Sequence, residues 1–221
     1  SNAGGLGIIG AASMYPDVLK AQIKKCQAAT SKPFAVNIPL LYPSVEEHME
    51  TIVELKVPIV FTSAGSPKTW TSHLKSHGII VAHVVSSSTF ALKSELAGVD
   101  AVVAEGFEAG GHNGREETTT MCLVPAVSKT CSIPVIAAGG LHDGKSVLAA
   151  MVLGAEGAQL GSRFVASEDS SSHKAFKDAV LSAGEGSTTF TTREITPVSM
   201  LHHSLLTALL QSQESGESQE R

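Results

Sequence analysis

The chain has 221 residues, of which 43% are hydrophobic and 17% charged, so it can bury a sizeable core and does not have the composition of a disordered protein. Its formal net charge is −5, and Lys and Arg form no block or stripe, which argues against a nucleic-acid partner. No apolar stretch approaches the ~20 residues that a membrane span needs, and no basic segment precedes an apolar run as in a signal peptide.

Short apolar runs alternate along the chain with stretches of helical spacing. Each run is too short for a core helix, and most end in Gly, Ser or Pro, as buried parallel strands do. The predicted strands are Leu6–Gly10, Phe34–Leu40, Pro58–Ala64, Ile79–Val85, Ala101–Glu105, Pro134–Ala138 and Ala158–Phe164. The predicted helices are Pro16–Ala29, Val45–Leu55, Thr69–His77, Thr89–Ala97, Met121–Lys129, Lys145–Leu153 and His173–Leu181.

Several helix ends carry local signals. Ser44 and Asp143 precede predicted helices and are expected to act as N-caps. Gly78, Gly98 and Gly154 follow three helices, at the position where a left-handed residue costs glycine least.

The C-terminal part of the chain has a different composition. Ser182–Thr192 is rich in Gly, Ser and Thr and is predicted to be a loop, whereas Val198–Leu210 has helical apolar spacing. Gln211–Arg221 contains no apolar residue and is expected to be disordered. We therefore expect a barrel domain over residues 1–198 and a C-terminal helix with a polar tail over residues 199–221.

Repeated β-α units predict an α/β fold with right-handed crossovers. Seven predicted strands are one short of a TIM-type (β/α)8 barrel, and the missing first strand would precede Ser1. The chain starts without an initiator Met, so Ser1–Ala3 is either a tag remnant or lies inside a longer protein. An open doubly wound sheet is the alternative fold.

The three cysteines are odd in number and form no CxxC pair, which is typical of thiols in a reducing compartment such as the cytoplasm. They are Cys26, Cys122 and Cys131. The sequence contains neither a P-loop nor an H-E-x-x-H motif, so neither P-loop nor zincin chemistry is supported and no metal ligand is assigned.

Two late strands end in small residues. Gly139 and Gly140 follow one strand, while Gly161 and Ser162 follow the start of the next. Such turns let a phosphate approach backbone N–H groups, and neighbouring late strands form the usual phosphate site of a barrel. Either turn alone is more simply a tight turn, but the two together favour a phosphate site.

A glycine-rich loop after the fifth predicted strand surrounds His112. Gly110, Gly111 and Gly114 allow its backbone to lie against a flat ligand, and an imidazole can move protons near neutral pH. The other eight histidines are interpreted as surface or core groups. Among them, His83 lies in a predicted strand and is expected to be packed, although the end of that strand would face the same site.

Three blocks carry a family resemblance: Ala104–Gly114, Pro134–Gly140 and Gly157–Phe164. They resemble the nitronate monooxygenases (2-nitropropane dioxygenases) and the related FMN-dependent enoyl-ACP reductases. The resemblance implies an FMN-binding barrel in which His112 is the catalytic residue. The residues that it implies for cofactor binding are Asn37, Glu105, Gly110, Gly111, Gly139, Gly140, Gln159, Gly161 and Ser162; at Glu105 many members carry Gln.

The resemblance implies small-molecule substrates and leaves three activities open. The first is oxidative denitrification of alkyl nitronates with O₂, and the second is NAD(P)H-dependent reduction of an enoyl thioester. The third is a truncated barrel that binds flavin or phosphate without turnover, or that serves only as a partner-binding scaffold. A homodimer is left open as the oligomeric state. The family's opening Pro-Ile-x-Gln-Gly-Met-type strand is absent, and the C-terminal lid region is replaced by the polar tail.

Overall fold

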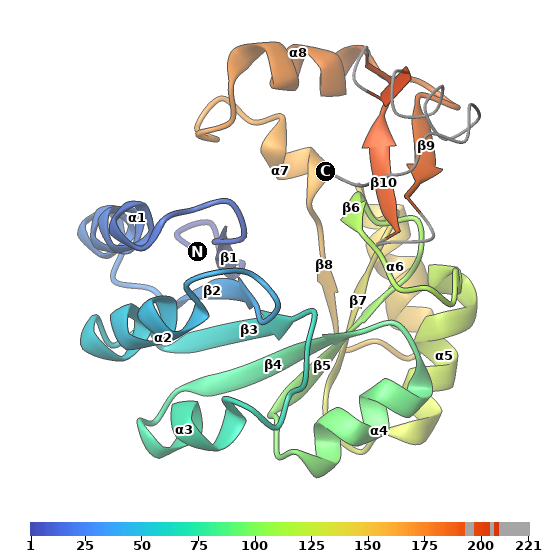
Figure 1. Ribbon diagram of the computed structural model, residues 1–221. Coiled ribbons are helices and arrows are strands. Elements are labelled where there is room, and N and C mark those ends of the chain that lie inside the picture. Colours follow the sequence, from blue (N-terminus) through green and yellow to red (C-terminus); the bar gives the residue numbers. More distant parts are fainter. Residues whose placement is uncertain (193–196, 204–205, 208–221) are drawn as a thin grey trace, which may run out of the picture.

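A computed structural model describes residues 1–192, 197–203 and 206–207. Its main element is a seven-stranded parallel sheet whose spatial order follows the chain and which curls from β1 to β8 (Figure 1). The strands are β1 Gly7–Gly10, β2 Phe34–Pro39, β3 Ile59–Ser63, β4 Ile80–Val85, β5 Ala101–Glu105, β7 Val135–Ala138 and β8 Gly157–Gln159. Six of the seven predicted strands are confirmed with ends that differ by at most one residue, and the seventh is confirmed only at its start.

Six helices connect these strands, and further helices follow β8. They are α1 Pro16–Ala29, α2 Val45–Glu54, α3 Thr71–Ser76, α4 Ser88–Leu96, α5 Thr120–Thr130, α6 Gly144–Val152, α7 Ser162–Val165 and α8 Lys174–Ser182. The seven predicted helices are confirmed, whereas α7 occupies part of the predicted strand Ala158–Phe164. That strand stops at Gln159, so this prediction was wrong beyond the first residues.

The connecting helices pack on one face of the sheet. The larger core cluster joins strand residues such as Val36 and Val102 to helix residues such as Leu19 and Leu123. The smaller cluster lies on the other face and is formed by strand residues alone. A doubly wound sheet has helices on both faces, so the barrel-type fold is confirmed and that alternative is excluded. Among the described residues β1 and β8 do not pair, so the sheet is a curled half-barrel.

A small antiparallel sheet lies beyond the carboxyl ends of the main strands. It contains β6 Gly111–His112, β9 Thr188–Thr191 and β10 Val198–Leu201, in the order β6-β10-β9. The predictions of a loop through residue 192 and of a helix from Val198 were therefore wrong in this region. Thr and Phe favour the extended conformation of β9. The short apolar run of β10 fits a helix and a strand pattern equally well, and its pairing with β6 and β9 makes it a strand. The predicted tail Gln211–Arg221 lies outside the described residues.

The predicted helix ends are mostly confirmed. Gly78, Gly98 and Gly154 all have positive φ. Asp143 forms a capping box with Ser146 at the start of α6. Ser44 does not cap α2 through its side chain, because its backbone is left-handed (φ 62°) and turns the hydroxyl away from the first helical N–H groups.

Candidate functional site

Three polar side chains point from the strand ends into the concave side of the sheet. Successive strand residues alternate faces, and Ala35 and Val103 belong to the inner cluster, so Asn37 and Glu105 face inward as well. Gln159 pairs in register with the inward Ala138, which itself pairs with Glu105. The three residues therefore lie on the concave face of the sheet, at its carboxyl end.

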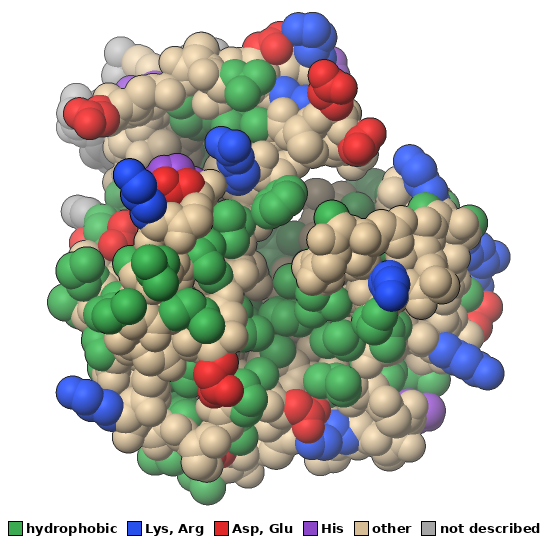
Figure 2. Space-filling view, turned by 180° about the vertical axis from the view of Figure 1, so that it is seen from behind, with side chains coloured by type: hydrophobic (Ala, Val, Ile, Leu, Met, Phe, Trp, Pro, Cys, Tyr) green, Lys and Arg blue, Asp and Glu red, His purple; other side chains and the backbone are tan. Residues whose placement is uncertain are grey.

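The inner surface below these groups is apolar. Its buried members are Ala35, Phe61, Ala82, Val103 and Ala138, with Ile8, Val84 and Ile136 among those packed around them. Figure 2 shows a hollow between the α1 side of the molecule and the part formed by α7 and α8, with hydrophobic side chains gathered around it. An apolar wall with a few polar groups at one rim is the usual character of a cofactor site.

The side chain of Asn37 is held by the neighbouring strand. Its Nδ2 donates to the carbonyl oxygen of Phe61 (3.2 Å) and lies 3.4 Å from Oγ of Ser63. These contacts orient the amide at the end of β2. Both involve Nδ2, so neither uses the amide oxygen.

Glu105 is a half-buried carboxyl group at the end of β5. Desolvation raises its pKa from 4.5 to about 7, and no hydrogen bond to its side chain is found in the described part of the chain. A carboxyl group with this pKa can donate or accept a hydrogen bond near neutral pH.

His112 lies in β6, on a loop that is fixed at several points. Its backbone pairs with Val198 of β10, and the backbone N–H of Asn113 donates to Pro197 (2.9 Å). The amide of Asn113 donates to the carbonyl oxygens of Ala109 (2.8 Å) and Gly111 (3.1 Å). Although the His112 imidazole is exposed, it is supported by a backbone that the small sheet immobilises.

The base of this loop is anchored at Thr120, the first residue of α5. Its backbone N–H donates to Oε2 of Glu108 (2.8 Å), and its hydroxyl lies within 2.9 Å of both that oxygen and the carbonyl oxygen of Gly139. Gly106 also packs here, because an added Cβ would lie 2.0 Å from the Thr120 hydroxyl. One side chain thus joins the His112 loop to the turn after β7.

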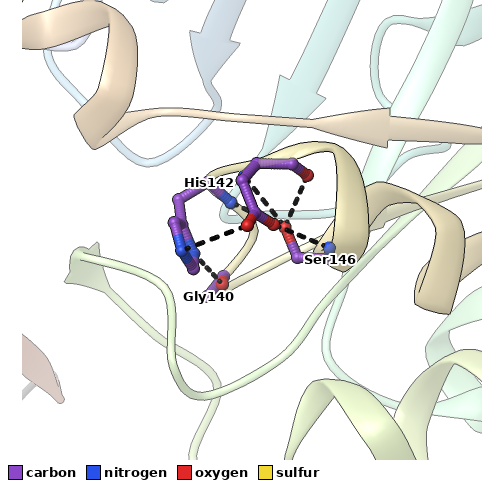
Figure 3. Close-up of polar contacts among 4 residues, drawn as sticks. Gly140, His142 and Ser146 are labelled. Atoms are coloured by element: carbon purple, nitrogen blue, oxygen red, sulfur yellow. Dashed lines mark hydrogen bonds and ion pairs between the residues drawn. The ribbon is translucent and has the colours of Figure 1, made fainter.

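The two glycine turns differ in their local structure. Gly139 has φ +101°, and an added Cβ would lie 2.7 Å from the carbonyl oxygen of Gly106, so packing alone requires glycine there. A Cβ at Gly161 would contact nothing within 4 Å, so the turn that leads into α7 is open. At Gly140 the turn continues into the capping box of α6, where the backbone N–H of His142 donates to Oγ of Ser146 (3.0 Å; Figure 3).

The loops that carry these residues leave the sheet side by side. Glu105, Ala138 and Gln159 are paired in register, and the His112 loop and the two turns begin directly after them. His83, by contrast, lies on the outer face beside Val81 and Val85, where its Nδ1 is 2.7 Å from Oγ1 of Thr62. Burial lowers its pKa to about 4, so His83 is a packed neutral group, as expected.

Sequence reasoning did not find two contributors to this region. Tyr42, in the loop after β2, places its hydroxyl 3.3 Å from Nδ1 of His112. Asn113 has a buried Oδ1 without a hydrogen-bond partner among the described residues, next to His112. No local pattern reveals either feature, because each depends on tertiary contacts.

Comparison with known proteins decides the family. The nitronate monooxygenase family matches residues 1–54 and 43–220, which together cover nearly the whole chain. The chain belongs to the nitronate monooxygenase family. This confirms the resemblance that the three sequence blocks carried.

Two curated relatives illustrate the range of similar proteins. A probable nitronate monooxygenase of Staphylococcus haemolyticus is 35% identical, and the match covers 86% of this chain and 66% of the relative. A (3aS,4S,5R,7aS)-5-hydroxy-7a-methyl-1-oxo-octahydro-1H-indene-4-carboxyl-CoA dehydrogenase of Mycobacterium tuberculosis is 37% identical, with 98% of this chain and 60% of the relative covered. The chain therefore spans somewhat less than two thirds of the length of these relatives.

Solved structures agree with this family. FabK from Thermotoga maritima has a TM-score of 0.92 and 42% identity, covering 97% of this chain and 69% of that chain. A nitroalkane oxidase from Streptomyces ansochromogenes has a TM-score of 0.84 and 26% identity, covering 93% of this chain and 72% of that chain.

The helices in the described part of the chain are all too short or too polar to span a membrane.

Proposed function

We propose that this family member holds FMN at the carboxyl end of its sheet and oxidises alkyl nitronates with O₂, giving nitrite and a carbonyl product. The observation that supports this proposal is the arrangement of the strand ends. Glu105, Ala138 and Gln159 lie in register, and the His112 loop and both glycine turns start from that edge. This common edge supports contact of all three features with a single ligand.

The residues present fit a flavin. The inner face provides an apolar wall for a flat ring system, and Asn37, Glu105 and Gln159 provide hydrogen-bonding groups at its rim. The turn at Gly161–Ser162 is open on its Cβ side, so a phosphate could approach its backbone N–H groups. Gly139 contributes differently, by allowing the turn after β7 to pack against Gly106.

Each group then has a separate task in the proposed reaction. FMN, when bound, supplies the electron transfer, and the protein supplies position and electrostatics. His112 removes the proton from the carbon next to the nitro group when the substrate is a neutral nitroalkane. Asn37 and Gln159 orient the ring, while the apolar wall excludes water from it.

The three cysteines are free, and we assign the protein to the reducing cytoplasm.

The proposal is tested first by flavin content. The purified chain, or the chain incubated with FMN and desalted, is expected to show flavin absorbance. Turnover is then measured as O₂ consumption, first with propionate 3-nitronate and then with a neutral nitroalkane as the second substrate. Replacement of His112 by Asn should lower turnover of the neutral nitroalkane by about 10²- to 10⁴-fold, with a smaller effect on the preformed nitronate. A protein that takes up no FMN, or a His112 variant with unchanged activity, would refute the assignment.

A second candidate is reduction of an enoyl thioester with NAD(P)H. The Mycobacterium tuberculosis relative, 37% identical to this chain, is described as a carboxyl-CoA dehydrogenase, and a CoA compound is a thioester-type substrate as this second reaction requires. Assays with crotonyl thioester and NADH or NADPH, run beside the nitronate assay on the same flavin-loaded sample, distinguish the two reactions.

A further inference from the structure

Two exposed histidines lie one turn apart at α3, the first within the helix and the second as its C-cap residue. The rings of His73 and His77 have centroids 4.7 Å apart and an interplanar angle of 52°. Residues four apart on a helix are neighbours on its surface, and such a pair can present two imidazoles to one ion. These residues precede β4 and so lie at the amino end of the sheet, opposite the candidate flavin site (Figure 1).

The hydrogen bonding of His77 fixes which nitrogen is available. Its Nδ1 lies 2.9 Å from the backbone carbonyl oxygen of His73, and a carbonyl can only accept, so Nδ1 carries the hydrogen. The lone pair is therefore on Nε2. A bond from the second ring nitrogen to a backbone carbonyl is the arrangement that orients histidine ligands in metal sites.

His73 is positioned by an aromatic neighbour. Its ring contacts Trp70 edge to face, with centroids 5.5 Å apart and planes at 81°. Within the described residues neither of its ring nitrogens has a hydrogen bond, so either can bind an ion. The nearest cation on the helix, Lys75, is engaged with Asp100 (2.6 Å) and with the carbonyl oxygen of Gly98 (3.0 Å), which reduces its repulsion of a bound cation.

We propose that His73 and His77 form a surface site for a divalent late first-row transition metal, of which Cu²⁺ and Ni²⁺ bind most strongly. Two neutral imidazoles suit these ions, whereas Mg²⁺ and Ca²⁺ require oxygen ligands. The described residues contain no group of three or more His, Cys, Asp or Glu side chains that could hold a metal ion, so the pair provides two ligands and water completes the coordination.

Trp70 provides the measurement, because it is the only tryptophan in the sequence. Ni²⁺ bound beside His73 is expected to quench its fluorescence in a saturable manner that EDTA reverses. Ni²⁺ is used as the probe because Cu²⁺ oxidises thiols and Cys122 is exposed. Mg²⁺ at the same concentration should have no effect.

Variants of the two ligands test the assignment. His73→Asn and His77→Asn should each weaken Ni²⁺ binding roughly tenfold or more, since loss of even an outer-shell partner costs that much at a metal site. His173→Asn, at the exposed start of α8, is the matched control and should titrate like the unchanged protein. Isothermal titration calorimetry repeats the comparison independently of fluorescence, and circular dichroism confirms that the variants fold. Absence of saturable quenching, or an affinity in both ligand variants equal to that of the unchanged protein, would overturn the proposal.

Discussion

The hydroxyl of Tyr42 lies 3.3 Å from Nδ1 of His112, across 70 residues of sequence. The two rings meet edge to face, with centroids 6.1 Å apart and planes at 85°. This contact connects the loop after β2 to the small sheet. It also fixes the orientation of the imidazole, because a hydrogen bond to one ring nitrogen determines which nitrogen faces a substrate.

Replacement of Tyr42 by Phe keeps the ring contact and removes the hydrogen bond. One such bond is worth about 0.5–1.5 kcal/mol, so we expect kcat with nitroalkane to fall about two- to tenfold while KM changes little. Tyr15→Phe is the control, since Tyr15 is the only other tyrosine and is exposed. Equal kcat and KM values for both variants would show that the contact has no catalytic role.

Replacement of Thr120 by Val tests the anchor of the His112 loop. Valine has nearly the same shape but leaves Glu108 and the carbonyl oxygen of Gly139 without the Thr120 hydroxyl. We expect a loss of about 1–3 kcal/mol in the free energy of unfolding, measured in urea. Thr120→Ser should recover most of it. Thr130→Val removes a similar bond at the exposed end of α5 and should cost less, and a result in the reverse order would contradict this account.

Alanine at the two glycine turns should separate packing from ligand contact. At Gly139 both the positive φ and the approach to Gly106 oppose a Cβ, so Gly139→Ala should cost more than about 2 kcal/mol of stability. Gly161→Ala should leave stability nearly unchanged, because its Cβ meets open space, and should weaken FMN binding in a fluorescence titration. If Gly161→Ala binds FMN normally, the phosphate does not lie at this turn.

The elements predictable from sequence were those determined by local pattern. Apolar runs predicted the parallel strands, and glycines marked the ends of helices, because both signals are contained within a few neighbouring residues. The β9–β10 pairing was not predictable: Val198–Leu201 is extended because Thr188–Thr191 and β6 are there to pair with it. The same holds for Tyr42 and Thr120, whose roles depend on contacts between distant segments.

The positions of the candidate site residues were better anticipated than their roles. Asn37, Glu105 and Gln159 end strands, and the period of two places them on one face once the register is known. Gly139 is interpreted from sequence as part of a phosphate turn, which stays a prediction, and the structure adds a second reason for glycine because its missing Cβ makes room for Gly106. A glycine motif alone does not distinguish close packing against protein from close approach of a ligand.

Glu105 should make stability depend on pH in a direction opposite to most carboxyl groups. Its pKa is raised from 4.5 to about 7 in the folded protein, so folding favours the protonated form. The resulting stabilisation is complete below about pH 4.5 and is lost as the pH rises through 7. Each pKa unit corresponds to about 1.36 kcal/mol, so the loss is at most about 3 kcal/mol. Urea unfolding of the flavin-free protein at several values between pH 5 and 8 measures it.

The comparison with Glu105→Gln isolates this effect from that of His83. Because burial lowers the pKa of His83 to about 4, its protonation in the unfolded chain reduces stability as the pH falls below about 6.5. His83 is present in both proteins, so its contribution cancels in their difference. The stability of Glu105→Gln relative to the unchanged chain should therefore rise from pH 5 and level off above about pH 7. Glu95→Gln is the control: hydrogen bonds from Ser132 lower the pKa of that exposed carboxyl, so its difference should stay flat over this range. A flat difference for Glu105→Gln as well would show that Glu105 is ionised throughout this pH range, because solvent reaches its carboxyl group.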